Sequence, residues 1–266
     1  MKWLSVLVIV LGLLVSSCKK ESTALPEVTV LGHAGTSLHR DRAVFPANSF
    51  ESIKYAIDIL DADGVEVDVQ MTRDSILVLY HDQFLDFSTN MTGCVSEYSF
   101  EELKMAKLDN SNYNLIDLEQ VLKFVESRKK SVFLDVKTYD FCKKKNISIS
   151  AFEYALSNCK SKLSSNFNSK ITLSSESTWF LNQINHTIKC IEVEDVKNGI
   201  EKINSFGFQS FLIKLEDISE SDVEVLKTIS WGLQGVKDEW TVDDGIKLLP
   251  KFVITDNIAY TRKVTN

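Results

Sequence analysis

The chain has 266 residues, of which 44% are hydrophobic and 25% charged, and its net charge is −7. This length suits one folded domain with an ample core, and the acidic balance without a basic stripe argues against a nucleic-acid partner. With only 3 prolines and 10 glycines, the sequence predicts regular elements joined by short loops.

The first residues have the pattern of an export signal. Met1 and Lys2 give a positive start, residues 4–15 are almost wholly apolar, and small residues then lead to Cys18. An apolar run of about twelve residues is too short to span a bilayer comfortably, which favours a signal peptide over a membrane helix. Val15-Ser-Ser-Cys18 resembles the lipobox of bacterial lipoproteins, in which Cys18 becomes the lipidated first residue. An ordinary cleaved signal, with Cys18 uninvolved, is the alternative.

We therefore predict three segments along the chain. Residues 1–17 form the signal peptide, residues 18–27 a tether, and residues 28–266 a single domain. The mature protein is then exported, and a lipid anchor holds it at the membrane of the cell envelope.

The remaining cysteines lack the paired close spacing of a zinc site. They are Cys94, Cys142, Cys159 and Cys190. An exported protein can oxidise a pair such as Cys142 with Cys159, and buried free thiols are equally compatible with the spacing.

Strands and helices alternate through the domain. In chain order, apolar strands are predicted at residues 28–32, 64–70, 131–136, 171–174, 188–193, 211–215, 231–236 and 252–255. Helices are predicted after Ser49 and Asp117 and near residues 100–106, 152–156, 179–184, 196–206, 222–229 and 243–248. Residues 76–80 follow the second strand too closely for a parallel crossover and predict an antiparallel arm. Eight strand–helix units predict an α/β fold, a (β/α)8 TIM barrel with a small insertion after the second strand.

The second strand carries the most informative pattern of the chain. Three valines alternate with Glu66, Asp68 and Gln70, so the two carboxylates project from one face. Adjacent carboxylates repel each other, and a divalent cation that prefers oxygen ligands relieves that repulsion. His81, thirteen residues beyond Asp68, adds a group that carries a proton near neutral pH. The pattern predicts metal-assisted acid–base chemistry.

Other ionisable residues end neighbouring strands. His33 ends the first predicted strand, and Asp135 and Lys137 end the third. The working groups of (β/α)8 barrels lie at the C-terminal ends of the strands. We therefore expect these side chains to converge on one rim with Glu66 and Asp68.

Several motifs, in order and spacing, resemble the glycerophosphodiester phosphodiesterase family, within the superfamily of phosphatidylinositol-phospholipase-C-like phosphodiesterases. The motifs are Leu31-Gly-His-Ala-Gly35, Phe45-Pro-Ala-Asn-Ser49, Gly64-Val-Glu-Val-Asp-Val69, Thr72-Arg-Asp74, His81-Asp82, Ser88-Thr-Asn-Met-Thr-Gly93, Glu101-Glu-Leu103, Leu134-Asp-Val-Lys137, Glu239-Trp-Thr-Val242 and Ile254-Thr-Asp256. The segment from Asn48 to Gly93 is the specific part of this resemblance.

The resemblance implies hydrolysis of glycerophosphodiesters, small or lipid-derived, to an alcohol and glycerol phosphate. It also implies one bound divalent cation, Mg²⁺ or Ca²⁺. The residue roles that it implies are metal ligation by Glu66, Asp68 and Asp135, acid–base catalysis by His33 and His81, phosphate contact by Lys137, and a pocket wall at Trp240.

Two positions depart from the family pattern. Ala34 stands where the family has an arginine that grips the phosphate, and Arg40 and Arg42 in the following loop are the candidates to replace it. Asp135 stands where glutamate is usual, and its side chain is one methylene shorter. The cation would therefore lie closer to Asp135, or a water molecule would bridge the cation and the Asp135 carboxylate.

Less informative residues are expected outside the site. His39 is a weaker candidate, and His186 is expected at the surface. Glu192 and Glu194 repeat the spacing of the acid pair but are interpreted as rim or solvent residues. Trp240 suits either a pocket wall or the core.

Two other functions remain compatible with the sequence. The same site could serve a phospholipase C or D-like enzyme that acts on lipid or glycan phosphodiesters. A non-catalytic barrel that binds a phosphorylated ligand is supported by Ala34 alone.

Overall fold

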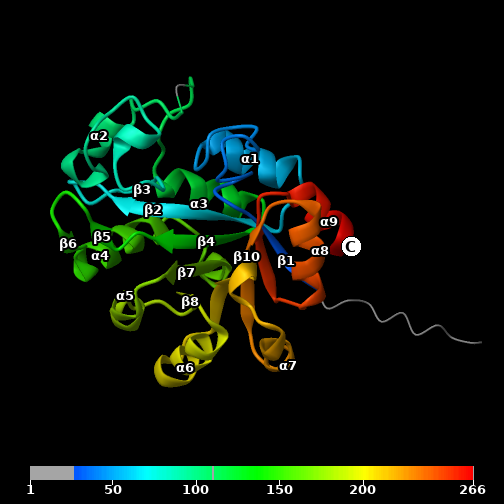
Figure 1. Ribbon diagram of the computed structural model, residues 1–266. Coiled ribbons are helices and arrows are strands. Elements are labelled where there is room, and N and C mark those ends of the chain that lie inside the picture. The colour runs from blue at the N-terminus through cyan, green and yellow to red at the C-terminus, as the bar shows by residue number, and fades with distance from the viewer. Residues whose placement is uncertain (1–26, 110, 266) are drawn as a thin grey trace, which may run out of the picture.

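A closed barrel of parallel strands forms the centre of the structure, a computed structural model that describes residues 27–109 and 111–265. The barrel closes because β1 pairs with both β2 and β11, which confirms the predicted (β/α)8 fold (Figure 1). Its strands are β1 (Thr29–Gly32), β2 (Gly64–Met71), β4 (Ser131–Val136), β7 (Ile171–Ser175), β8 (Lys189–Val193), β9 (Ser210–Lys214), β10 (Trp231–Val236) and β11 (Phe252–Thr255). The predicted signal peptide and Cys18 lie outside the described residues.

Helices surround the barrel. They are α1 (Phe50–Asp58), α3 (Leu118–Ser127), α4 (Ile149–Lys160), α5 (Thr178–Gln183), α6 (Val196–Phe206), α7 (Val223–Leu226), α8 (Glu239–Lys247) and α9 (Ile258–Thr265). Ser49 and Asp117 cap α1 and α3 as predicted, because each side chain accepts a hydrogen bond from a backbone N–H of the first turn. Helix α9 was not predicted, since Ile258 and Thr261 are its only buried residues and its apolar periodicity is weak.

Strand alternation separates two apolar layers. Val65, Val67 and Val69 of β2 point outward and pack with the surrounding helices. A smaller cluster fills the inside of the barrel: Leu31, Phe133, Cys190, Leu212 and Ile254. Polar side chains that follow these residues toward the C-terminal strand ends therefore lie inside the barrel, above an apolar floor.

The insertion after β2 has its own small core. Strand β3 (Leu77–Leu79) pairs antiparallel with the end of β2, as predicted for the arm. The short helices η1 (Leu85–Phe87), η2 (Val95–Glu97) and α2 (Phe100–Leu103) follow it. Buried residues of the insertion form a separate cluster that includes Val78, Tyr80, Leu85, Val95, Leu103 and Leu115. In Figure 1 the insertion lies beside the C-terminal end of β2, next to the expected site.

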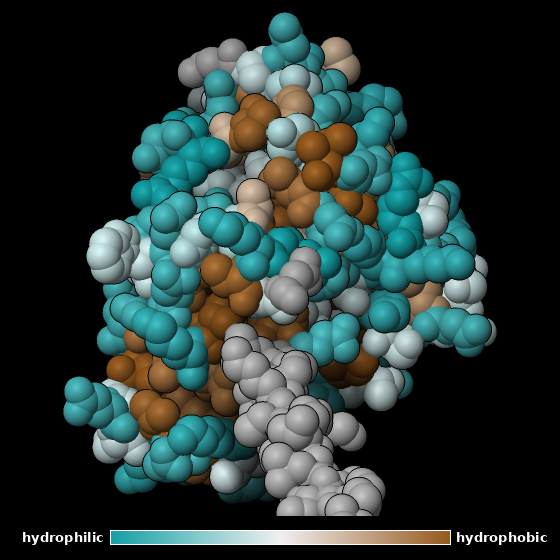
Figure 2. All heavy atoms as spheres, turned by 90° about the vertical axis from the view of Figure 1, so that its right-hand side faces the viewer, coloured by the Kyte–Doolittle hydropathy of each residue, from teal (hydrophilic) through white to brown (hydrophobic). Residues whose placement is uncertain are grey.

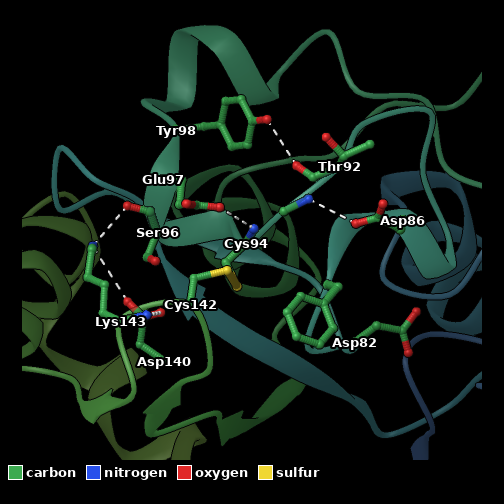
Figure 3. Close-up of a disulfide and its surroundings, with 12 residues drawn as sticks. Asp82, Asp86, Thr92, Cys94, Ser96, Glu97, Tyr98, Asp140, Cys142 and Lys143 are labelled. Atoms are coloured by element: carbon green, nitrogen blue, oxygen red, sulfur yellow. Dashed lines mark hydrogen bonds and ion pairs between the residues drawn. A yellow bond between two sulfur atoms is a disulfide. The ribbon is translucent and has the colours of Figure 1, made fainter.

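A disulfide joins Cys94 of the insertion to Cys142, 48 residues further on (Figure 3). Cys142 lies in the turn between β5 (Tyr139–Asp140) and β6 (Lys145–Asn146), a hairpin that the sequence analysis did not predict. The suggested pairing of Cys142 with Cys159 is wrong. Cys159 lies on the buried face of α4 and Cys190 lies inside the barrel, so both are buried free thiols.

Figure 2 shows the face that lies on the right-hand side of Figure 1, on which hydrophobic patches lie between polar side chains. In the described part of the chain, no helix has both the length and the apolar character needed to cross a bilayer.

The described chain begins at Glu27 and enters β1 at Thr29, at the end of the barrel opposite the C-terminal strand ends.

Candidate active site

Three carboxylates converge inside the rim of the barrel. Asp68 of β2 lies directly beside Asp135 of β4 in the strand register, and Glu66 lies one step lower on the same face of β2. One carboxylate oxygen from each residue lies within 4.8 Å of the other two. The structure therefore brings together the three predicted metal ligands.

The loop after β1 fixes two of these carboxylates. The backbone N–H of Ala34 donates a 2.9 Å hydrogen bond to Oε2 of Glu66. The side-chain amide of Asn48 donates to Oδ2 of Asp68 at 2.8 Å, and its carbonyl accepts from the backbone N–H of Asp68 at 3.0 Å. Asn48 was recognised only as part of a motif. Its left-handed φ of 61°, which asparagine tolerates well, turns its side chain toward Asp68.

Lys137 partly neutralises the acid cluster. Its Nζ lies 2.8 Å from Oδ1 of Asp68 and 2.6 Å from Oδ2 of Asp135. Burial alone would lower the pKa of Lys137, but these two carboxylates raise it well above its usual value. Its predicted contact with a phosphate remains a prediction.

One ammonium does not balance three carboxylates. Burial, reinforced by the charge of Asp68, raises the pKa of Glu66 to about 8. Burial likewise raises the pKa of Asp135, whereas the charges of Lys137 and His81 outweigh burial at Asp68 and lower its pKa to about 2. An all-oxygen donor set with surplus negative charge fits a hard divalent cation such as Mg²⁺ or Ca²⁺.

His33 is held by a carboxylate from the far end of the chain. Its Nδ1 lies 3.0 Å from Oδ1 of Asp256, which also accepts a 3.1 Å hydrogen bond from the backbone N–H of Leu38. Burial would lower the pKa of His33, but the hydrogen bond to Asp256 and the charge of Glu66 raise it to about 9. His39 approaches the same carboxylate, with Nε2 3.6 Å from Oδ2.

His81 has a matching arrangement. Its Nδ1 lies 3.0 Å from Oδ1 of Asp82, and Ser88 donates a 2.5 Å hydrogen bond to the other oxygen of that carboxylate. The hydrogen bond to Asp82 raises the pKa of His81. In both histidines a carboxylate engages Nδ1, so Nε2 is the ring nitrogen left for a substrate.

The sequence analysis quoted Asp82 and Asp256 only within family motifs and gave neither a role. For Asp256 a local signal exists, since it follows the inward-facing Ile254 by two residues at the end of β11.

Arg40, rather than Arg42, borders the site. Arg40 lines a cavity of about 300 Å³ together with Asn48 and His81. Its Nη2 donates to the carbonyl of Phe87 at 2.6 Å. The guanidinium of Arg42 instead donates to the carbonyl of Lys237 at 2.5 Å.

Trp240, near the start of α8, is 83% exposed. In the part of the chain that the structure describes, it lines none of the three main cavities. Its role as a pocket wall therefore stays a prediction.

Glu192 lies at the rim, one of the two places expected for it, whereas His186 is placed differently from expectation. Glu192 lies on the same face of β8 as Cys190, inside the barrel, and accepts a hydrogen bond from the amide of Gln234. Burial and the charge of Asp135 raise its pKa to about 7. His186 is buried rather than exposed, and its Nε2 lies 2.9 Å from the carbonyl oxygen of Ile171. Strand alternation from Cys190 would have found Glu192.

Comparisons with known proteins show the family of the chain. Residues 39–202, more than half of the chain, match the model of the Glycerophosphoryl diester phosphodiesterase family. A "Glycerophosphodiester phosphodiesterase" of Bacillus altitudinis is 38% identical over 90 residues, 32% of this chain and 36% of the relative. A human "Glycerophosphodiester phosphodiesterase 1" is 32% identical over 92 residues, 34% of this chain and 26% of the relative. The chain thus matches only about a third of the length of such curated relatives.

Solved structures share the fold over almost the whole barrel. A glycerophosphodiester phosphodiesterase from Thermotoga maritima has a TM-score of 0.70 and 22% identity, covering 89% of this chain and 98% of its own. A phosphodiesterase from Oleispira antarctica was solved in complex with the product sn-glycerol-3-phosphate. It has a TM-score of 0.74 and 16% identity, and the match covers 88% of this chain and 95% of that protein.

The fold and the rim geometry define a (β/α)8-barrel protein with a candidate cation site and two histidine–aspartate pairs at one rim. The chain belongs to the glycerophosphoryl diester phosphodiesterase family.

Proposed function

We propose that the protein hydrolyses glycerophosphodiesters to an alcohol and glycerol phosphate. The observation that carries the proposal is the convergence of three carboxylates and two histidine–aspartate pairs on one rim. The names of the curated relatives, and the product described for the Oleispira antarctica structure, support the same substrate class.

Glu66, Asp68 and Asp135 would hold one divalent cation, Mg²⁺ or Ca²⁺. When bound, such a cation neutralises the phosphoryl oxygens and the charge that develops on them. Lys137, which is paired with Asp68 and Asp135, and Arg40, which is paired with Asp109 at 2.7 Å, are our candidates to contact the phosphate. Arg40 is our candidate for the arginine that Ala34 replaces.

The two histidines divide the proton transfers. Overall, water adds across one P–O bond, with its OH going to phosphorus and a proton to the departing alkoxide. One group must accept a proton from the attacking hydroxyl while another protonates the leaving oxygen. Asp256 and Asp82 orient His33 and His81 through Nδ1, so each ring presents Nε2 for one of these tasks.

The position of the proposed anchor favours a soluble substrate over a lipid in the same bilayer. If Cys18 carries the lipid, the residues from 18 to 27 reach at most about 30 Å. The chain enters β1 at the end of the barrel opposite the site, so a short tether would keep that end nearer the membrane than the rim. A phospholipase-like activity on the anchoring membrane would need the opposite orientation.

Turnover assays with single variants test the proposal. The purified protein with Mg²⁺ or Ca²⁺ should release glycerol phosphate from a glycerophosphodiester, detected by phosphorus NMR. His81→Ala should lower kcat by roughly 10²–10⁴, the usual contribution of one proton-transfer group. Glu66→Gln should abolish the response to the cation, whereas Glu194→Gln, at an exposed acid, serves as the matched control.

Unchanged turnover in His81→Ala would rule out proton transfer by His81 and with it the proposed two-histidine mechanism. Saturable binding of the diester without product, at any cation concentration, would instead favour the non-catalytic alternative.

A further inference from the structure

A second part of the rim has no role in the proposed chemistry. A cavity of about 500 Å³ has His81, Asp135 and Lys137 in its wall and extends between the insertion and the β5–β6 hairpin. Cavities of this size hold drug-sized ligands. Glycerol phosphate with a small polar alcohol would leave much of it unfilled.

Aromatic side chains form the wall of this cavity away from the carboxylates. We call Phe87, Tyr139 and Phe141 the aromatic wall, and all three line the cavity. They are 60%, 44% and 39% exposed. The rings of Tyr139 and Phe141 have centroids 5.0 Å apart, and Phe84 bridges to the third ring at 6.3 Å from Phe141 and 5.9 Å from Phe87.

Grouped exposed aromatic side chains are unfavourable in water and commonly mark a binding site. Met71, Val136 and Ile147 line the same cavity and extend its apolar surface.

The disulfide between Cys94 and Cys142, shown in Figure 3, links the two segments that carry the aromatic wall. Phe87 comes from the insertion and Phe141 from the hairpin, and the bond from Cys94 to Cys142 joins these segments next to Phe141. Lys143 adds a 3.0 Å hydrogen bond from its Nζ to the carbonyl of Ser96. A cross-linked wall is preorganised, so a ligand loses little free energy in ordering it.

Most carboxylates around the cavity already have a cationic or protonatable partner, so none of them is a free counter-ion for a cationic alcohol next to the aromatic wall. Three of the four carboxylates that line it are already paired with cationic or protonatable groups: Asp82 with His81, Asp135 with Lys137, and Asp140 with Lys143. Glu176, the fourth, is exposed to solvent and thus strongly hydrated. An ammonium group would also be attracted to the ring faces, but it must give up its own hydration to lie there, whereas an apolar group gains by displacing water from the rings.

We infer that the aromatic wall binds the alcohol part of the substrate and that this alcohol carries an apolar chain or ring. The inference rests on the proposed function and adds the substrate class. Glycerol phosphate would occupy the carboxylate end of the cavity, with the scissile P–O bond between the two ends. The released alcohol would leave along the aromatic wall.

A homologous series of glycerophosphodiesters tests this, with ethanol, butanol and hexanol as the alcohol. If each added methylene is buried, kcat/KM should rise by about two- to fourfold per CH2 until the cavity is full. Choline and 3,3-dimethylbutanol diesters form a matched pair, equal in shape and different in charge. The neutral diester should be turned over at least as well as the choline diester.

Variants locate the effect. Phe141→Ser should reduce the dependence of kcat/KM on the length of the alcohol chain. Tyr139→Ser tests the same effect if the first variant does not fold. Phe206→Ser on α6 is the control, because Phe206 is 43% exposed and lines none of the main cavities in the described chain.

Equal kcat/KM across the series, or preference for choline over its neutral isostere, would overturn the inference while leaving the proposed function intact. Retention of the full chain-length dependence in both serine variants would overturn it too. If no diester were turned over, the proposed function would fail and the inference with it.

Discussion

Lowering the pH should weaken binding of the cation through Glu66. Without a cation, the pKa of Glu66 is about 8, raised by burial and by the charge of Asp68. The cation binds the ionised carboxylate, so a proton must leave whenever binding occurs below that pKa. About one half of the Glu66 carboxyl groups are ionised at pH 8 and about one hundredth at pH 6. The apparent affinity for the cation should therefore fall by about fiftyfold from pH 8 to pH 6.

Isothermal titration calorimetry measures this linkage directly. Titrations of Mg²⁺ or Ca²⁺ at pH 7, in two buffers that differ in ionisation enthalpy, should show release of nearly one proton. Glu66→Gln should bind the cation more weakly and lose most of the proton release, while Glu194→Gln should behave like the unmodified protein. Affinity that is constant from pH 6 to 8, or proton release that persists in Glu66→Gln, would refute the reasoning.

Three further predictions follow from particular contacts. Replacing Cys94 and Cys142 by serine should lower the free energy of unfolding by up to about 4 kcal/mol in urea titrations, because the disulfide links residues 48 positions apart. A reductant should destabilise the unmodified protein but not the serine variant. Equal effects of the reductant on both proteins would contradict this prediction. Asp256→Asn should lower kcat by about 10- to 100-fold with little change in KM, because His33 loses the carboxylate that orients its ring. A change confined to KM would count against the orienting role of Asp256. Cys18→Ser should move the protein from the membrane to the soluble fraction of the envelope, and an unchanged distribution would exclude the lipid anchor.

Much of the fold could be predicted because its signals are local and periodic. Alternation along β2 places Glu66 and Asp68 on one face, and the structure confirms that this face is the inside of the barrel. The caps at Ser49 and Asp117 depend only on the first turn of each helix, so three or four residues suffice to recognise them. Regular alternation of strands and helices then leaves a closed parallel barrel as the natural arrangement.

Partners that are distant in the chain could not be predicted in the same way. Asp256 reaches His33 across 223 residues, because barrel closure sets β11 beside β1. The pairing of Cys94 with Cys142 depends on how the insertion folds over a hairpin that itself lacks a strong local pattern.

The sequence by itself therefore determined the strand pattern, the order of the elements and the acidic face of β2. Only the tertiary structure decided which carboxylate orients His33, that Arg40 rather than Arg42 borders the site, and which thiols are oxidised. The physical reason is that local periodicity fixes the direction of a side chain, whereas contacts between distant segments depend on strand register and barrel closure.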